Sequence, residues 1–187
     1  MAKQPKFNAS MPTVILHGKE PFLMSRYTAD LQQALEKEHG EIESIVFDGT
    51  TVALSTVLDE IRTFDLLMRY KLVIVDNADS FLAAKGAENK NVRRVLERYV
   101  ESPVASATLL LRATTWRPGK LDKLISKNGL VYKLQQYNEP DTMRWCIARC
   151  EKEHGCELEH QGAHLLVQRI GLSLTKLDTE LGKLSAR

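Results

Sequence analysis

The sequence predicts an α/β protein in which a parallel five-stranded sheet lies between layers of helices, followed by a small helical domain. Short apolar runs rich in valine and isoleucine are bounded by turn residues, as in strands that are buried on both faces. Segments with apolar residues at three- and four-residue steps separate these runs, as amphipathic helices would. This alternation favours strands that pair in parallel and are joined by crossover helices.

Composition is that of an ordinary globular protein. The 187 residues are 43% hydrophobic and 27% charged, and no stretch offers the roughly 20 apolar residues that a membrane helix needs. The formal net charge of +2 is too small to argue for nucleic acid by itself. The three cysteines and the absence of a secretory signal at the N-terminus favour a reducing compartment, so we expect the cytoplasm and no membrane partner.

Five apolar runs are expected to form the strands of the sheet. They comprise residues 13–17, 44–47, 72–75, 108–111 and 130–134. Helical spacing of apolar residues predicts helices between several of these runs, from Phe22 to the glycine stop at Gly40, from Leu54 to Phe64, and from Val92 to Tyr99.

A domain boundary is expected near Pro140, where strand-like runs give way to helical spacing. We therefore assign residues 1–139 to the α/β domain and residues 140–187 to a three-helix lid, with Asp141 and Thr142 as candidate caps of its first helix. The sequence stops at Arg187, within or just at the end of an amphipathic helix, and this favours a longer full-length protein.

The loop after the first predicted strand resembles a phosphate-binding loop that has lost most of its chemistry. In the pattern G-x-x-x-x-G-K-[ST], glycines let backbone N–H groups cradle phosphates, while lysine and a hydroxyl hold phosphate oxygens and magnesium. With Gly18 as the first glycine, Leu23, Met24 and Ser25 occupy the last three positions, so only the hydroxyl remains. The alternative is that Gly18 simply turns the chain from strand to helix.

A second motif of P-loop ATPases is also incomplete. In such enzymes a buried strand ends in an aspartate for magnesium, followed by a glutamate that polarises the attacking water. Here the strand ends in Asp76 and Asn77, and the neutral amide of Asn77 cannot accept a proton. Asp76 could instead cap a turn at the strand end. Together the two motifs favour a P-loop-like fold that does not hydrolyse nucleotide.

The order of these pieces resembles the delta subunit of the bacterial DNA polymerase III clamp loader, a relative of the AAA+ ATPases. The residues that carry the resemblance are 14–23 (VILHGKEPFL), 47–49 (FDG), 66–76 (LLMRYKLVIVD), 108–111 (TLLL) and 171–184 (GLSLTKLDTELGKL). The resemblance implies an AAA+ sandwich, a helical lid and no ATP hydrolysis. We also expect no cofactor and no metal. It also implies a third, collar domain, which this sequence lacks.

Leu66 and Leu67 match the clamp-binding element of that family, a hydrophobic wedge that is commonly Leu-Phe. The residues themselves favour the same place. One face of the preceding helix is already filled by Leu54, Leu58, Ile61 and Phe64, so the run Leu66–Leu67–Met68 cannot all point inward. An exposed apolar tip suits a protein-binding anchor. The alternative is that these residues pack beneath the edge of the sheet.

The resemblance implies a noncatalytic subunit that opens the sliding clamp during DNA replication. The implied partners are the clamp (beta), the delta prime and tau/gamma subunits of the loader, and DNA only indirectly or weakly. As part of the DNA polymerase III holoenzyme, the chain would belong to a DNA-directed DNA polymerase, a nucleotidyltransferase, without catalytic residues of its own. The competing interpretations are a nucleotide-hydrolysing AAA+ ATPase and a DNA-binding module.

Two further residue patterns remain open at this point. Cys146, Cys150, His160 and His164 have a spacing reminiscent of a zinc site, although core thiols on one helix explain the cysteines more simply. A basic segment and the sequence Trp116-Arg-Pro-Gly-Lys120 could meet DNA phosphates, although glutamates interleave with the basic segment as on a solvated helix face. That segment comprises Lys85, Lys90, Arg93, Arg94 and Arg98.

Overall fold

The computed structural model of the chain describes residues 5–63, 68–83 and 92–186. The chain divides into two compact units, one of residues 5–134 and one that begins at Gln135, and each is described by itself.

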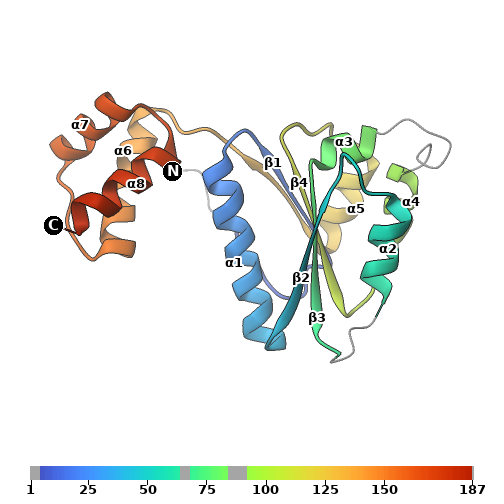
Figure 1. Ribbon diagram of the computed structural model, residues 1–187. Helices are drawn as coiled ribbons and strands as arrows, with labels where there is room; N and C mark the ends of the chain where they lie inside the picture. Colours follow the sequence, from blue (N-terminus) through green and yellow to red (C-terminus); the bar gives the residue numbers. More distant parts are fainter. Residues whose placement is uncertain (1–4, 64–67, 84–91, 187) are drawn as a thin grey trace. The chain divides into compact units, whose positions relative to one another are not determined.

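A five-stranded parallel sheet forms the centre of the first unit (Figure 1). The strand order is β2-β3-β4-β1-β5, and every neighbouring pair is parallel. Each of the five predicted runs falls inside an observed strand. The strands are β1 (Thr13–Gly18), β2 (Ile42–Asp48), β3 (Tyr70–Asp76), β4 (Ala107–Ala113) and β5 (Leu130–Leu134).

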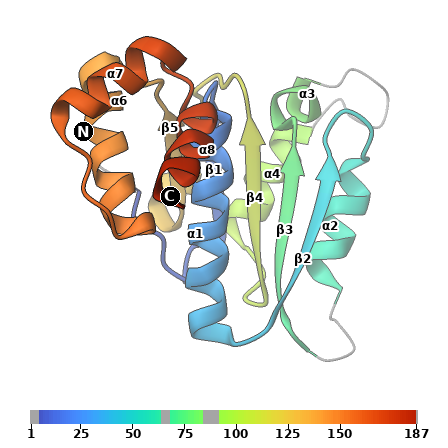
Figure 2. The same cartoon turned by 60° about the vertical axis from the view of Figure 1, so that its left-hand side comes forward.

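Helices cover both faces of this sheet, so the predicted three-layer α/β sandwich is confirmed. Helix α1 (Pro21–His39) lies on one face (Figure 1). Helices α2 (Leu54–Arg62), α4 (Val92–Glu101) and α5 (Lys120–Asn128) lie on the other face, and a short helix, α3 (Ala78–Ala83), follows β3. Figure 2 shows β2 at one edge of the fanned sheet, next to β3.

Alternation along the central strands distributes their side chains between the two helical layers. Ile15, Val73 and Leu109 belong to the core cluster that α2, α4 and α5 complete. The neighbouring residues Val14 and Leu16 point to the opposite face and are fully buried. Because these strands are buried on both sides, they lack the polar alternation of a half-exposed sheet.

Two helices and one cap were missed by the sequence analysis. Helix α5 joins β4 to β5, and the spacing of its buried Leu121 and Ile125 was the available signal. Helix α3 has only six residues, too few for periodicity to reveal. The first helix of the second unit, α6 (Glu139–Arg149), is capped by Asn138, whose side chain accepts a hydrogen bond from Asp141 N, so Asp141 and Thr142 are not its caps.

The second unit is helical and has its own small core. After α6 come a π-helical turn, η1 (Cys150–His154), and helices α7 (His160–Ile170) and α8 (Leu174–Ser185). Pro140 lies in the first turn of α6, where its missing N–H has no intrahelical partner to lose. Arg149 of α6 donates to Asp178 of α8 at 2.6 Å and ties these two helices together. The buried side chains include Trp145, Cys146, Val167, Leu174, Leu177 and Leu181.

Leu31 tests the α1 layer because its side chain is fully buried in the middle of the helix. We expect Leu31→Ala to lower the free energy of unfolding by about 2–5 kcal/mol, because it removes buried apolar volume and leaves a cavity. Gln33→Ala, at an exposed position on the same helix, should change stability by less than about 0.5 kcal/mol. Chemical denaturation of both variants measures the contrast, and equal losses would contradict this packing.

Candidate functional site

The loop between β1 and α1 begins with a glycine that the packing of the sheet requires. Gly18 has φ +142°, and a Cβ atom placed on it would lie 2.2 Å from the carbonyl oxygen of Leu134 in β5. Gly18 and Leu134 are also partners in the register between β1 and β5. This close approach gives Gly18 a structural reason that does not depend on phosphate.

A cavity of about 390 Å³ lies beside this loop, at the carboxyl ends of β1, β3 and β4. The loops that follow parallel strands meet at one edge of the sheet, which is where α/β proteins bind ligands. Five of the six predicted nucleotide-site residues line this cavity; Leu23 is buried in the α1 layer instead. The lining residues are Gly18, Lys19, Glu20, Pro21, Met24, Ser25, Asp76, Asn77, Arg112, Ala113 and Thr114.

Glu20 places a carboxyl group in the loop that would cradle phosphates, and the sequence analysis missed it. The residue is only 7% exposed, and burial raises the pKa of its carboxyl group above the ordinary value. An ionised carboxylate at this position would repel a phosphate group. Glu20 therefore disfavours phosphate binding, as does the replacement of the motif's lysine by Met24. Its position directly before Pro21 and the helix was the available signal.

Asp76 is held by an arginine from the neighbouring strand. Arg112 of β4 donates through Nε to Asp76 Oδ1 and through Nη2 to Asp76 Oδ2, the latter at 2.6 Å. Arg112 Nη1 also lies 3.5 Å from Thr28 Oγ1 on α1. A two-point contact of this kind is among the stronger ion pairs in proteins. The carboxylate that the sequence analysis associated with magnesium is therefore already engaged by a cation of the chain itself.

Asn77 hydrogen-bonds to Asp48, the last residue of β2. Its Nδ2 donates to Asp48 Oδ1 at 2.9 Å, and its backbone has a positive φ of 51°. Asp48 also accepts a hydrogen bond from Thr50 N, and these hydrogen bonds, led by that of Thr50, lower the pKa of the Asp48 carboxyl group. Gly49 N donates to Asp76 O at 2.8 Å, so residues 47–49 support the end of β3 directly.

The predicted clamp-binding residues follow α2 and precede β3. Leu66 and Leu67 lie outside the described residues, as does Phe64 of the predicted helical stripe. Met68 is described: its side chain is 80% exposed and its backbone has φ +52°. Positive φ is uncommon for a residue with an unbranched bulky side chain, and such geometry is often found at functional positions.

A buried lysine joins α2 to β3, the two elements on either side of this connection. Lys71, the second residue of β3, is 4% exposed, and its ammonium donates to the carboxylate of Glu60 on α2. The same Nζ lies 3.4 Å from the backbone oxygen of Glu60 and 3.8 Å from Oε2 of Glu43 on β2. A buried charge is tolerated only with such partners, so the contact fixes the end of α2 against the start of β3.

The candidate zinc residues are not brought together. Cys150 Sγ lies 3.1 Å from Cys156 Sγ, and His164 Nε2 lies 3.8 Å from Glu139 Oε1. Burial raises the pKa of both Cys146 and Cys150 to about 11, which disfavours the thiolate form that binds metal. Within the described part of the chain, no three His, Cys, Asp or Glu side chains form a metal-binding group.

The basic segment and the tryptophan loop meet in space. Arg93 of α4 donates through Nη1 to the backbone oxygen of Arg117 at 3.3 Å, and its guanidinium lies over the Trp116 ring at 5.7 Å. Arg94 and Arg98 are on the same helix, whereas Lys85 and Lys90 lie outside the described residues.

None of the helices described is long and apolar enough to cross a membrane.

Comparison with protein families gives a match over the α/β domain. The family described as DNA polymerase III, delta subunit, matches residues 15–139, which is more than half of the chain. The comparison with curated protein sequences gave no match.

Solved structures of similar fold include a clamp-loader protein. The chain is similar to the Bacillus subtilis DNA clamp loader delta protein (YqeN), with a TM-score of 0.71 and 25% sequence identity. That match covers 94% of this chain and 53% of the other, so this chain spans about half the length of that relative.

More distant structures share the fold alone. A mutant of Thermotoga maritima RuvB has a TM-score of 0.54 at 17% identity, covering 92% of this chain and 54% of that one. A chain of the Escherichia coli MS115-1 HORMA:CdnC:Trip13 complex has a TM-score of 0.52 at 12% identity, covering 86% and 59%.

Glu20 gives the site a pH dependence that can be measured. Because burial raises its pKa in the folded state, the folded protein holds this proton more tightly than the unfolded chain does. Stability is therefore lost as the pH rises from the ordinary value of 4.5 through the raised value. We expect Glu20→Gln to be more thermostable than the wild type at neutral pH, with the difference shrinking as the pH falls toward 4.5.

Thermal melts of both proteins across this pH range measure the difference directly. Glu36→Gln, on an exposed part of α1, is the control for removing one carboxylate and should show no such pH-dependent gain. A Glu20→Gln difference that is constant with pH would contradict the raised pKa.

Proposed function

Because this chain belongs to the family of DNA polymerase III delta subunits, we propose that it is a noncatalytic subunit of the bacterial clamp loader that binds the sliding clamp. The observation that carries the proposal is the cavity beside Gly18, which lies where a nucleotide site would be, while Asp76 is engaged by Arg112 and Asn77 by Asp48. In this proposal the chain acts in the bacterial cytoplasm through protein contacts and has no reaction of its own.

Three side chains of the cavity argue against ATP turnover. Met24 carries no charge to offset the phosphates, Asp76 is engaged by Arg112, and Asn77 donates to Asp48. Phosphoryl transfer depends on positioning and on cations arranged around the phosphates, so the loss of these groups removes most of the catalytic machinery. The buried carboxyl group of Glu20 adds repulsion in the same place.

The clamp-binding surface in this proposal is the connection that holds Leu66, Leu67 and Met68. Met68 supports it because it presents a large apolar side chain, 80% exposed, at one end of this connection. The Lys71 contact with Glu60 supports it as well, because it fixes both flanks of the connection. When the flanking elements are held in place, a few apolar side chains can supply most of an interface's binding energy.

Clamp opening requires no covalent step. A ligand shifts a conformational equilibrium only by the difference between its affinities for the two states. In this proposal, the connection 66–68 binds the clamp better when one of its subunit interfaces is open than when the ring is closed. Roughly 1.4 kcal/mol of such preference changes the ratio of open to closed rings tenfold.

The remaining partners follow from the family. We propose that the α/β domain of residues 1–139 presents the clamp-binding residues and that residues 140–187 act as its helical lid. The chain spans about half of the Bacillus subtilis relative. Assembly with the delta prime and tau/gamma subunits would then depend on a collar domain outside this sequence, within the polymerase holoenzyme.

The clamp-binding proposal predicts the effect of a double substitution. Leu66→Ser with Leu67→Ser should weaken binding of the cognate sliding clamp by at least about 30-fold, the loss of one binding hot spot of roughly 2 kcal/mol or more. Val46→Ser is the matched control, because Val46 is an apolar residue of the same unit that is 56% exposed on β2. Isothermal titration with the purified clamp measures all three proteins.

Circular dichroism must show that the double variant keeps its fold. Unchanged clamp affinity in a folded double variant would refute the assignment of residues 66–68. An equal loss in Val46→Ser would show that general surface hydrophobicity, and not this connection, carries the binding.

The noncatalytic proposal predicts that the chain releases no phosphate from ATP in the presence of magnesium. Arg112→Ala frees Asp76 but restores neither the lysine nor the general base, so this variant should be equally inactive. A continuous phosphate-release assay on both proteins is the measurement. Turnover that disappears in Asp76→Asn would favour the competing hypothesis of an AAA+ ATPase.

A further inference from the structure

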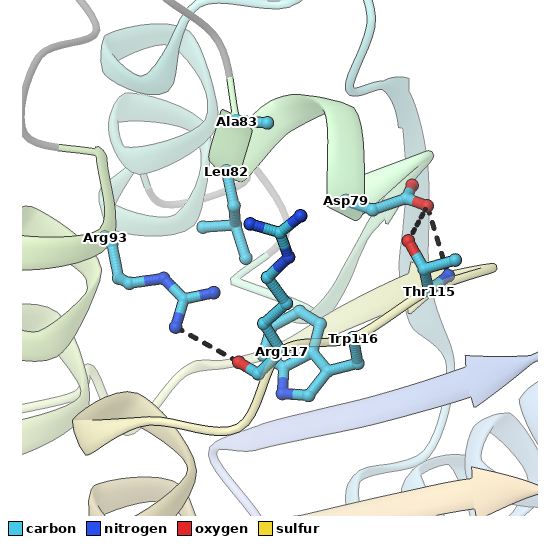
Figure 3. Close-up of a pocket in the computed structure, with 7 residues that line it drawn as sticks. All are labelled: Asp79, Leu82, Ala83, Arg93, Thr115, Trp116 and Arg117. Atoms are coloured by element: carbon cyan, nitrogen blue, oxygen red, sulfur yellow. Dashed lines mark hydrogen bonds between the residues drawn. The ribbon is translucent and has the colours of Figure 1, made fainter.

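A second cavity, of about 410 Å³, lies between α3, the start of α4 and the loop that follows β4 (Figure 3). Its volume falls within the range of roughly 300–1,000 Å³ that is typical of ligand pockets. Neither Met68 nor the loop after Gly18 is among the described residues that line this cavity. Its lining residues are Asp79, Leu82, Ala83, Arg93, Thr115, Trp116 and Arg117.

The cavity combines two guanidinium groups with an indole ring. Figure 3 shows the side chains of Arg93 and Arg117 close to Trp116. The Arg93 guanidinium lies 5.7 Å from the centre of the Trp116 ring, within the distance of a cation–π contact. The exposed guanidinium of Arg117 has no hydrogen-bond or ion-pair partner among residues 5–63, 68–83 and 92–186.

The single carboxylate of the cavity is already engaged. Asp79 Oδ2 accepts hydrogen bonds from Thr115 N at 3.1 Å and Thr115 Oγ1 at 3.0 Å (Figure 3). The two arginines therefore leave the lining with a formal excess of one positive charge. An anionic ligand is favoured over a cationic one.

The tryptophan loop is held from both ends. Asp79 holds Thr115 on one side of the indole, and Trp116 Nε1 donates to Asp122 in the first turn of α5 on the other. Asp122 also accepts a hydrogen bond from Gly119 N. Trp116 also packs partly against the core, and its ring centre lies 6.2 Å from that of His17. The part of the fixed indole that lines the cavity can stack on a flat ligand with little loss of side-chain entropy.

We propose that this cavity binds a nucleotide unit of single-stranded nucleic acid, with the arginines on the phosphate and Trp116 on the base. Aromatic rings and arginine planes are the surfaces on which proteins stack unpaired bases, and arginine is suited to phosphate. A duplex keeps its bases stacked on one another, so it offers the cavity only phosphates. The inference is independent of clamp binding.

Fluorescence anisotropy of a labelled oligothymidylate tests the proposal on the whole chain. We expect saturable binding that weakens with salt and is at least about fivefold weaker in Trp116→Ala, the lower limit for one stacked base. Trp116→Phe should retain most of the affinity, because it keeps an aromatic face. Arg93→Ala and Arg117→Ala should each lower the slope of log affinity against log salt by about 0.7, the value for one phosphate of a single strand.

Arg98→Ala is the matched control, because it removes the same charge from the same helix at a position that does not line the cavity. Equal losses in Arg98→Ala and Arg93→Ala would overturn the proposal in favour of diffuse charge. Loss of binding in Trp116→Ala with no rescue by phenylalanine would overturn the stacking role.

Competition experiments identify the source of the nucleotide unit. Unlabelled oligothymidylate should displace the probe better than either a duplex of the same length or a polyglutamate peptide. Stronger competition by free thymidine monophosphate, unit for unit, would overturn the strand assignment in favour of a mononucleotide site, and stronger competition by polyglutamate would overturn the nucleic-acid assignment. Clamp titrations on Arg93→Ala and Arg117→Ala should match the wild type, so failure here is distinguishable from failure of the clamp-binding proposal.

Discussion

The two-sided burial of a parallel sheet is the constraint on which the rest of this structure depends. Three central strands are buried between α1 and the opposite helical layer, so their apolar sequences require a helical layer on each face of the sheet. Parallel pairing then carries the ends of β1, β3 and β4 to the same edge. The cavity beside Gly18 lies at that edge, and the Trp116 cavity is lined by the loop after β4.

Local patterns in the sequence predicted the strands well because each is a compact run of buried residues. The helices α1, α2 and α4 also follow from apolar spacing, whereas α5 was missed although Leu121 and Ile125 carry the same signal. Caps depend on one hydrogen bond, and Asn138 was overlooked because Asp141 and Thr142 lie just beyond the proline. Boundaries are set by such single contacts more than by periodicity.

The candidate site was predictable in its location but not in its internal contacts. Gly18, Met24, Ser25, Asp76 and Asn77 could be placed at one edge because each follows a strand or begins a helix. The pairing of Asp76 with Arg112 joins residues 36 positions apart, and the position of Arg112 beside Asp76 depends on β3 and β4 being neighbours. The same holds for Arg93 and Trp116, since no local pattern brings α4 to the loop after β4.

The ion pair between Arg112 and Asp76 also bears on how such a chain could change over evolutionary time. A lysine at Met24 would restore one cation, yet the aspartate would still be occupied from β4 and the neighbouring amide would still be committed to Asp48. Three segments, those that hold Met24, Asn77 and Arg112, would have to be altered. The fold thus makes the present arrangement difficult to reverse by single substitutions.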